Sequence, residues 1–224
     1  MQEGVQADAF LFPALQPFNT GMLKVSPDHT LYFEQCGNPT GKPVIILHGG
    51  PGSGCSDDMR RYHDPEFYRI ILLDQRGAGR STPFASLEDN TDDPVVRIRA
   101  AIAWATWERT ISNLTPPDDA EDKVAANTKA TEAFARIENH YLINKGFLST
   151  DDFLLANAFK IRHIPTVIVQ GRYDVVSPMH TAWELHKVLP DAEFHVVQTA
   201  GHSGMEPPTV KELVTATNKL KLQQ

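Results

Sequence analysis

The sequence predicts an α/β fold, in which a mostly parallel sheet is interrupted by a helical cap. Short apolar runs typical of buried parallel strands occur towards both ends of the chain, at 44–47, 68–74 and 164–169. Helical periodicity dominates the middle, over 95–114 and 131–141. Strand and helix patterns then alternate to the end, as expected of an α/β core that carries an insertion.

The individual elements follow from local patterns. Residues 21–26 and 30–35 are β-prone runs around a Pro-Asp-His turn, and they predict a hairpin. The continuous apolar runs 42–48 and 68–74 predict strands buried on both faces, with a short helix at 57–62 between them. Helices are expected at 95–114, 131–141, 150–160, 179–189 and 209–220, and further strands at 164–169 and 193–197.

Composition excludes several classes of protein. A net charge of −7 over 224 residues, with no long basic run, argues against nucleic acid as the main partner. Cys36 and Cys55 form neither a disulfide framework nor a CxxC pair, which favours a reducing, cytoplasmic compartment. No leader pattern opens the sequence and no run approaches eighteen apolar residues, so we expect no membrane partner. Composition leaves the oligomeric state open.

A glycine-rich loop, His48–Gly52 (HGGPG), follows the first buried strand. Loops of this kind build the oxyanion hole of α/β-hydrolases. In that fold the catalytic acid follows a late strand and the histidine follows the last strand, where Asp174 and His202 stand here. The acid would orient the imidazole, and His202 would take the proton of a nucleophile. Taken singly, Asp174 also fits a turn former, and a lone loop histidine often has no role.

The expected serine nucleophile is missing. No serine lies in a GxSxG motif or between a buried strand and a helix in the middle of the chain. Ser81 comes closest in character, but Pro83 follows it and no helical pattern begins there. The nine serines are Ser26, Ser53, Ser56, Ser81, Ser86, Ser112, Ser149, Ser177 and Ser203.

Motifs for metals and cofactors are also missing from the sequence. It contains no HExxH motif and no zinc-type spacing of cysteine and histidine. The GAGRS stretch at Gly77–Ser81 lacks the third glycine of a dinucleotide fingerprint. We therefore expect neither a metal nor a cofactor.

Several segments together resemble proline iminopeptidase (prolyl aminopeptidase), a serine-peptidase family of the α/β-hydrolases. The matching stretches are FNTGMLKVS, HTLYFEQCGNP, HGGPG, DQRGAGRSTP, FARIENHY, VIVQGRYDVVSP and AGHS. DQRGAGRS and GRYD together are specific, whereas HGGPG alone is not. The resemblance implies peptide substrates with an N-terminal proline, whose prolyl group is transferred to serine and then to water.

The resemblance also implies roles for individual residues. Asp174 and His202 would be the acid and base, and Gly49 and Gly50 would lie in the oxyanion loop. Cap glutamates hold the substrate's free amine in the family, and the matching positions are Glu108 (in AWATWE) and Glu138 (in ARIENHY). A buried ammonium group needs carboxylate partners, so the assignment is physically reasonable. Without the resemblance, both glutamates would pass for solvated helix residues.

The chain departs from the family at one join. Asn90-Thr91 runs directly into Asp92-Asp93-Pro94, so several dozen residues that carry the family's nucleophile elbow are absent, while both flanks keep the family pattern. This pattern indicates a deletion, which could arise from alternative splicing, from an error in the gene model or from engineering of the gene. The resemblance then divides the chain into an N-terminal core part (1–93), a cap remnant (94–150) and a C-terminal core part (151–224).

The deletion predicts a chain with little or no activity. Central strands would be lost, so the strands at 44–47 and 166–169 would either pair directly or form exposed, aggregation-prone edges. A second hypothesis is a non-catalytic module that binds N-terminal prolyl peptides or pairs with the intact enzyme. A third is rescue by another nucleophile beside the glycine loop, Ser53 or Cys55.

Overall fold

The computed structural model describes residues 6–85 and 94–221. These residues form two compact units, which are described separately. The first unit contains residues 1–11, 108–118 and 147–224, and the second contains residues 12–107 and 119–146. The boundaries differ from the three-part division expected from the resemblance, which stays a prediction.

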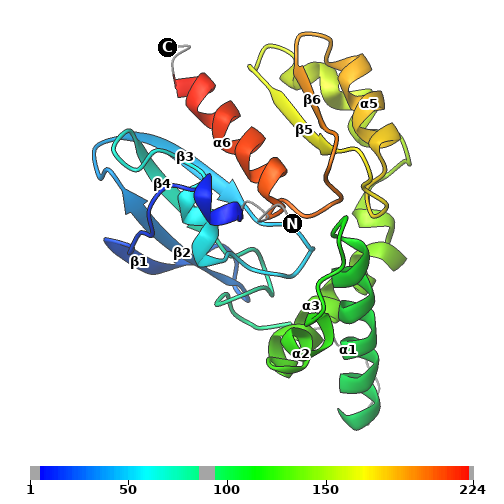
Figure 1. The fold of residues 1–224 in the computed structure, drawn as a ribbon. Coiled ribbons are helices and arrows are strands. Elements are labelled where there is room, and N and C mark those ends of the chain that lie inside the picture. The colour runs from blue at the N-terminus through cyan, green and yellow to red at the C-terminus, as the bar shows by residue number, and fades with distance from the viewer. Residues whose placement is uncertain (1–5, 86–93, 222–224) are drawn as a thin grey trace. The chain divides into compact units, whose positions relative to one another are not determined.

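The second unit is built on a four-stranded mixed sheet with the order β1-β2-β4-β3 (Figure 1). Strands β1 (Asn19–Lys24) and β2 (Thr30–Gly37) form the predicted antiparallel hairpin. Strand β4 (Tyr68–Leu73) pairs antiparallel with β2 and parallel with β3 (Lys42–Leu47). The prediction of parallel strands from these two apolar runs is thus confirmed.

One face of this sheet carries the core of the unit. Tyr68, Ile70 and Leu72 alternate along β4 and are buried together with Cys36 of β2. Partly buried apolar side chains of β3 and of the 3₁₀ turn Asp57–Arg61 (η2) pack against this cluster. The period-two burial of β4 is that of a strand with one face on a core.

Strand β3 is not buried on both faces, so that expectation is wrong. Ile45 is 62% exposed and Leu47 is 68% exposed, on the face opposite to the core. The physical reason is that successive side chains of a strand point to opposite faces, and the core cluster packs against the face of Val44 and Ile46. Strand β3 also lies at the sheet edge, with β4 as its one strand neighbour among the described residues. Strand β5 belongs to the other unit and pairs there with β6, so the direct β3–β5 pairing considered above stays a prediction.

Helices complete the second unit. The described part of the chain resumes at α1 (Pro94–Ile111), which belongs to this unit up to Trp107. A short helix, α2 (Ala120–Ala125), was not predicted, and it precedes α3 (Thr128–Ile143). The Asn127 side chain caps α3 by accepting a hydrogen bond from the Ala130 N–H group at 3.2 Å.

The first unit has a two-stranded parallel sheet of β5 (Val167–Gly171) and β6 (Glu193–Val197). Helices α5 (Met179–Val188) and α6 (Pro207–Lys221) lie on opposite sides of this sheet (Figure 1). The predicted helix at 150–160 is split into α4 (Phe153–Asn157) and a 3₁₀ turn, η4 (Ala158–Ile161). Two further 3₁₀ turns are η1 (Ala7–Ala9) and η3 (Lys145–Phe147).

Candidate active site

The glycine loop after β3 is fixed by a buried histidine. His48 is 5% exposed, and its Nε2 accepts a hydrogen bond from the Gln75 N–H group at 3.0 Å. Its Nδ1 lies 2.8 Å from the carbonyl oxygen of Gly49, to which it donates. This pattern assigns a neutral ring with its proton on Nδ1, because one ring nitrogen accepts and the other donates. His48 therefore holds the loop and has no free lone pair with which to act as a base.

The Asp74 carboxylate fixes the far end of the same loop. Its Oδ1 accepts from the Cys55 N–H group at 2.8 Å, and its Oδ2 accepts from the backbone N–H and the Nε of Arg80, both at 2.9 Å. A Cβ atom at Gly79 would fall on this carboxylate, and the φ angle there is +53°. Only glycine fits both the space and the backbone conformation at this position.

Asp74 belongs to a cluster of four charged side chains. Glu34, on β2, is 1% exposed, and its Oε1 accepts from Arg60 Nε at 2.6 Å. Its Oε2 accepts from Arg80 Nη1 at 3.0 Å, and the Arg80 guanidinium lies 3.8 Å above the centre of the Tyr32 ring. Two carboxylates and two guanidinium groups thus balance in charge, which is the condition under which buried ions are tolerated.

The arginines keep both carboxylates ionised. Burial alone raises the pKa of Glu34, but the hydrogen bonds and charge of Arg60, with Arg80, outweigh it and hold the pKa below its ordinary value of 4.5. Burial likewise raises the pKa of Asp74, and the hydrogen bonds from Arg80 and Cys55 bring it below 3.8. At neutral pH the glycine loop is therefore anchored to permanent charges.

Asp174 and His202 lie together in the first unit, at the ends of β5 and β6. The His202 Nδ1 is 2.9 Å from Oδ2 of Asp174, which is 9% exposed. Asp174 Oδ1 accepts from the N–H groups of Val176 and Ser177 at 3.0 and 2.8 Å, and Gln170 donates to its Oδ2 at 3.1 Å. An aspartate held in this way orients the imidazole and leaves its Nε2 for proton transfer.

The loop that carries His202 is anchored by the Ser112 carbonyl and the Glu206 carboxylate. The backbone N–H groups of His202 and Ser203 both donate to the Ser112 carbonyl, at 2.9 and 2.7 Å. The Gly201 N–H group donates to the Glu206 carboxylate at 2.6 Å. The only signal for Glu206 in the sequence is its place shortly after AGHS.

Neither candidate replacement nucleophile has suitable partners. The Ser53 hydroxyl donates to the Gly49 carbonyl at 2.7 Å and lies 3.3 Å from His48 Nδ1, the nitrogen that already carries a proton. The Cys55 thiol donates to the Leu73 carbonyl at 3.5 Å. Burial, followed by the neighbouring carboxylate, raises the pKa of Cys55 to about 11, so the thiol stays protonated at neutral pH.

Ser81 has a structural role. It is 1% exposed, its hydroxyl donates to the Asp74 carbonyl at 2.6 Å, and it accepts from the Tyr32 N–H group at 2.9 Å. Ser86 and the join at 90–93 lie outside the described residues.

The two candidate amine-binding glutamates differ in setting. Glu138, on α3, is 8% exposed, and its Oε2 accepts from the Trp104 indole N–H at 2.6 Å. Trp104 packs in turn on Trp107, with ring centres 5.5 Å apart. Glu108 is partly buried on α1 and belongs to the other compact unit. The sequence analysis did not identify Trp104 as a partner of Glu138. The two residues lie on different helices, and helical periodicity does not show which helices pack together.

The structure thus joins one pair of the predicted site residues, Asp174 and His202. Those two and Glu108 belong to the first unit, whereas Gly49, Gly50 and Glu138 belong to the second. Within residues 6–85 and 94–221, no group of three or more His, Cys, Asp or Glu side chains is arranged to hold a metal ion. No helix in that part of the chain is long and apolar enough to cross a membrane.

Among solved structures, the fold is similar to that of a bromoperoxidase from Bacillus anthracis. The TM-score is 0.64 at 18% identity, over 92% of this chain and 100% of that one. An esterase from Rhodococcus is similar with a TM-score of 0.57 at 15% identity, over 94% and 99% of the two chains. These likenesses show an α/β-hydrolase fold. A scan against protein-family models finds no match.

Curated proteins give a closer relation. The chain is 37% identical to a proline iminopeptidase of Xanthomonas citri, over 93% of this chain and 98% of that protein. It is 37% identical to one of Arabidopsis thaliana, over 94% and 82%, and 33% identical to one of Neisseria gonorrhoeae, over 94% and 98%. Identity at this level over nearly the whole chain shows that the protein belongs to the proline iminopeptidase family.

Proposed function

We propose that this chain carries the site of an aminopeptidase that releases N-terminal proline from peptides, without the nucleophile that the reaction needs. Asp174 would act as the acid of the triad and His202 as its base. Gly49 and Gly50 would supply oxyanion-hole N–H groups, and Glu108 and Glu138 would bind the substrate's amine. No metal or cofactor enters this scheme.

The observation that carries the proposal is the 2.9 Å contact between Asp174 and His202. The aspartate accepts hydrogen bonds from Val176, Ser177 and Gln170, which hold it where it can fix the ring with Nε2 available. Such a pair has no catalytic use on its own, because a triad also needs a serine, whose proton Nε2 would take.

A deletion accounts for the missing serine. The alignment with the Xanthomonas citri protein runs over 310 residues, which is more than the 224 residues of this chain, and still covers 98% of that protein. Part of the Xanthomonas citri protein therefore has no aligned residues in this chain, either as one contiguous block or as several smaller blocks. We place it at the join near Asn90–Pro94. The edge position of β3 among the described strands supports this placement, because an inserted strand would pair with its backbone N–H and C=O groups.

The test compares this chain with a version in which the corresponding segment of the Xanthomonas citri relative is inserted between Asn90 and Pro94. Hydrolysis of a prolyl-arylamide is measured for both. We expect turnover only from the restored chain, because loss of a catalytic serine costs about 10⁶ in kcat. His202→Ala in the restored chain should abolish that turnover. Comparable turnover by this chain, lost on His202→Ala, would refute the proposal and leave Ser53 and Cys55 to be examined.

A second candidate function is binding of N-terminal prolyl peptides without turnover, or pairing with the intact enzyme. The observation that favours it is Glu138, a buried carboxylate held in place by Trp104, which is suited to a secondary ammonium group. Saturable binding of prolinamide, lost on Glu138→Gln, would support it.

The unpaired Cys36 and Cys55 support a reducing compartment such as the cytoplasm.

A further inference from the structure

Gln170, the penultimate residue of β5, contacts the aspartate of the Asp174–His202 pair through its side chain. Its amide nitrogen Nε2 lies 3.1 Å from Asp174 Oδ2, 3.1 Å from the Ser177 carbonyl oxygen and 3.2 Å from the Gly171 carbonyl oxygen. Carbonyl oxygens and ionised carboxylates can only accept hydrogen bonds. The surroundings therefore assign the N–H₂ group, and not the amide oxygen, to this side of Gln170.

The oxygen that Gln170 contacts is also the one that faces the imidazole. His202 Nδ1 lies 2.9 Å from Asp174 Oδ2. The backbone N–H groups of Val176 and Ser177 donate instead to Oδ1. The terminal torsion of an aspartate is broad, so hydrogen bonds to one oxygen leave the carboxylate some freedom to swing. Gln170 adds a donor on the second oxygen, which restricts this swing and keeps Oδ2 in front of Nδ1.

We propose that Gln170 is a positioning residue for the proton-transfer pair, because its N–H₂ group holds Asp174 Oδ2 where it receives the Nδ1 proton of His202. The ring then keeps the tautomer with Nδ1 protonated and Nε2 able to accept a proton. Without the amide, Oδ2 faces the ring less often, and the tautomer protonated on Nε2 gains population. That tautomer cannot act as the base.

The role in catalysis rests on the proposed function, whereas the tautomer is a property of this chain. In a serine protease, a change of the aspartate that leaves the imidazole in the wrong tautomer costs about 10⁴ in kcat. A group that maintains the tautomer therefore affects the rate without contacting the substrate. The sequence gives no sign of this role, since Gln170 lies within a strand pattern.

The first test measures the tautomer of His202 in this chain by ¹⁵N nuclear magnetic resonance at pH 9, where an ordinary imidazole is neutral. The signals are assigned by their loss in His202→Ala. We expect the Nδ1-protonated form to predominate in the wild type. Gln170→Met keeps the length of the side chain and removes its donors. It should raise the ratio of the Nε2-protonated to the Nδ1-protonated form about tenfold, the factor that one hydrogen bond to a charged group provides.

A second variant, Gln170→Glu, keeps the shape of glutamine and replaces its N–H₂ group by an acceptor. At pH 9 the new carboxylate cannot donate to Asp174, so this variant should also raise the Nε2-protonated fraction. Agreement between the two variants would show that the donor matters, rather than the volume or polarity of the side chain.

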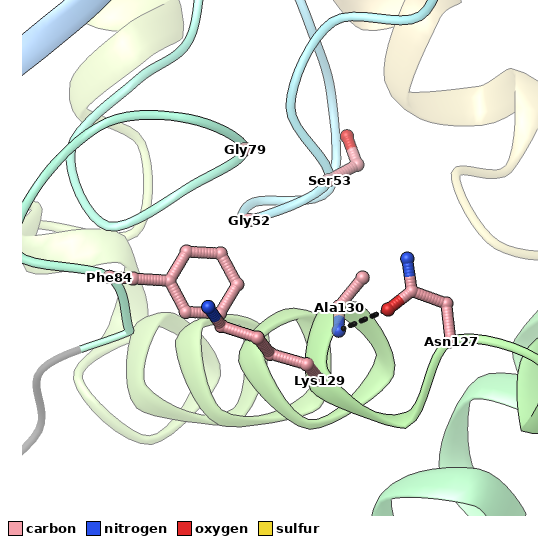
Figure 2. Close-up of a pocket in the computed structure, with 7 residues that line it drawn as sticks. All are labelled: Gly52, Ser53, Gly79, Phe84, Asn127, Lys129 and Ala130. Atoms are coloured by element: carbon pink, nitrogen blue, oxygen red, sulfur yellow. Dashed lines mark hydrogen bonds between the residues drawn. The ribbon is translucent and has the colours of Figure 1, made fainter.

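Two controls separate this effect from general losses. Gln198, which follows β6 in the same unit, donates to the Val196 carbonyl at 3.4 Å, so Gln198→Met removes an amide that does not reach the pair. Figure 2 shows the Asn127 amide of the second unit, whose oxygen accepts from the Ala130 N–H group. Asn127→Ala should lower the urea midpoint through loss of this helix cap. Both controls should leave the His202 tautomer unchanged.

The second test measures hydrolysis of a prolyl-arylamide by the restored chain with and without Gln170→Met. Because Gln170 acts on the base and not on the substrate, kcat should fall about tenfold while KM stays within about twofold. If the restored chain is inactive with Gln170 in place, the proposed function falls, and the tautomer in this chain still decides the role of Gln170. If the restored chain is active and Gln170→Met changes neither tautomer nor kcat, the positioning role falls alone.

Other results would also overturn the inference. One is a wild-type His202 protonated mainly on Nε2. Another is a lower urea midpoint with an unchanged tautomer, which would show that Gln170 only ties the loop together through the Gly171 and Ser177 carbonyls. Loss of the fold in both Gln170 variants would likewise make it a structural residue.

Discussion

Replacement of Arg60 by methionine tests whether the four-charge cluster stabilises the second unit. Arg60 is 6% exposed and makes two hydrogen bonds to Glu34, at 2.6 and 3.1 Å. Methionine keeps much of the apolar stem but removes the charge. Breaking a buried ion pair costs about 3–5 kcal/mol, and we expect the lower end because Arg80 still contacts Glu34. The ion pair with Asp57, whose side chain is 83% exposed, adds less than about 1 kcal/mol.

The assay is urea unfolding followed by circular dichroism at pH 7. A loss of about 3 kcal/mol moves the midpoint down by about 1–3 M urea. Lys123→Met is the matched control, since Lys123 forms an exposed ion pair with Asp119 in the same unit, at 3.0 Å. It should cost less than about 1 kcal/mol.

The dependence of this cost on pH provides a second check. The folded-state pKa of Glu34 is held below 4.5, so the carboxylate stabilises the native protein above that pH and ceases to do so as the pH falls through the folded-state value. The gap between wild type and Arg60→Met should therefore narrow below about pH 4.5. A cost no larger than that of Lys123→Met, or a gap that stays constant with pH, would refute the reasoning.

Three other predictions concern separate parts of the molecule. Burial raises the pKa of both Cys36 and Cys55 to about 11, so both thiols stay protonated at pH 8. A disulfide reagent at this pH should therefore label neither thiol in the folded chain and both thiols in urea. Rapid labelling of Cys55 in the folded chain would contradict this. Burial lowers the pKa of His63 to about 4, so the unfolded state takes up the proton first, and about 3 kcal/mol of stability is lost between pH 6.5 and 4. His63→Phe should flatten that part of the stability profile, and an unchanged slope would count against it. Ile45→Lys places a charge on the exposed face of β3 and should lower self-association in light scattering, whereas equal scattering would show that this face is not the contact.

The bounds of several individual strands and helices could be predicted from the sequence to within one or two residues. Strand β6 has the predicted bounds, and α5 differs by one residue, because each has a strong period and clear ends. The contact between Asp174 and His202 was also predictable, since these residues follow the last two strands, and parallel strands present such residues at one edge of a sheet.

Features that depend on distant partners could not be predicted. The exposed face of β3 arises because the core cluster packs against the opposite face, which an apolar run does not reveal. Glu34 and Arg60 meet across 26 positions of sequence, so neither residue signals the other. Helix α2 has six residues, too few for a helical period to stand out.

The interleaved composition of the two units has a consequence for the order of folding. The sheet β1-β2-β4-β3 is made from one continuous stretch, 19–73, with a hairpin at its start, so its contacts are local and can form while the rest of the chain is still being synthesised. The first unit instead joins the N-terminal turn to the C-terminal helix, with Lys211 lying 6.0 Å from the Phe10 ring centre. That unit can close only after α6 has left the ribosome. We therefore expect translation to yield a folded sheet first, and the unit that holds Asp174 and His202 last.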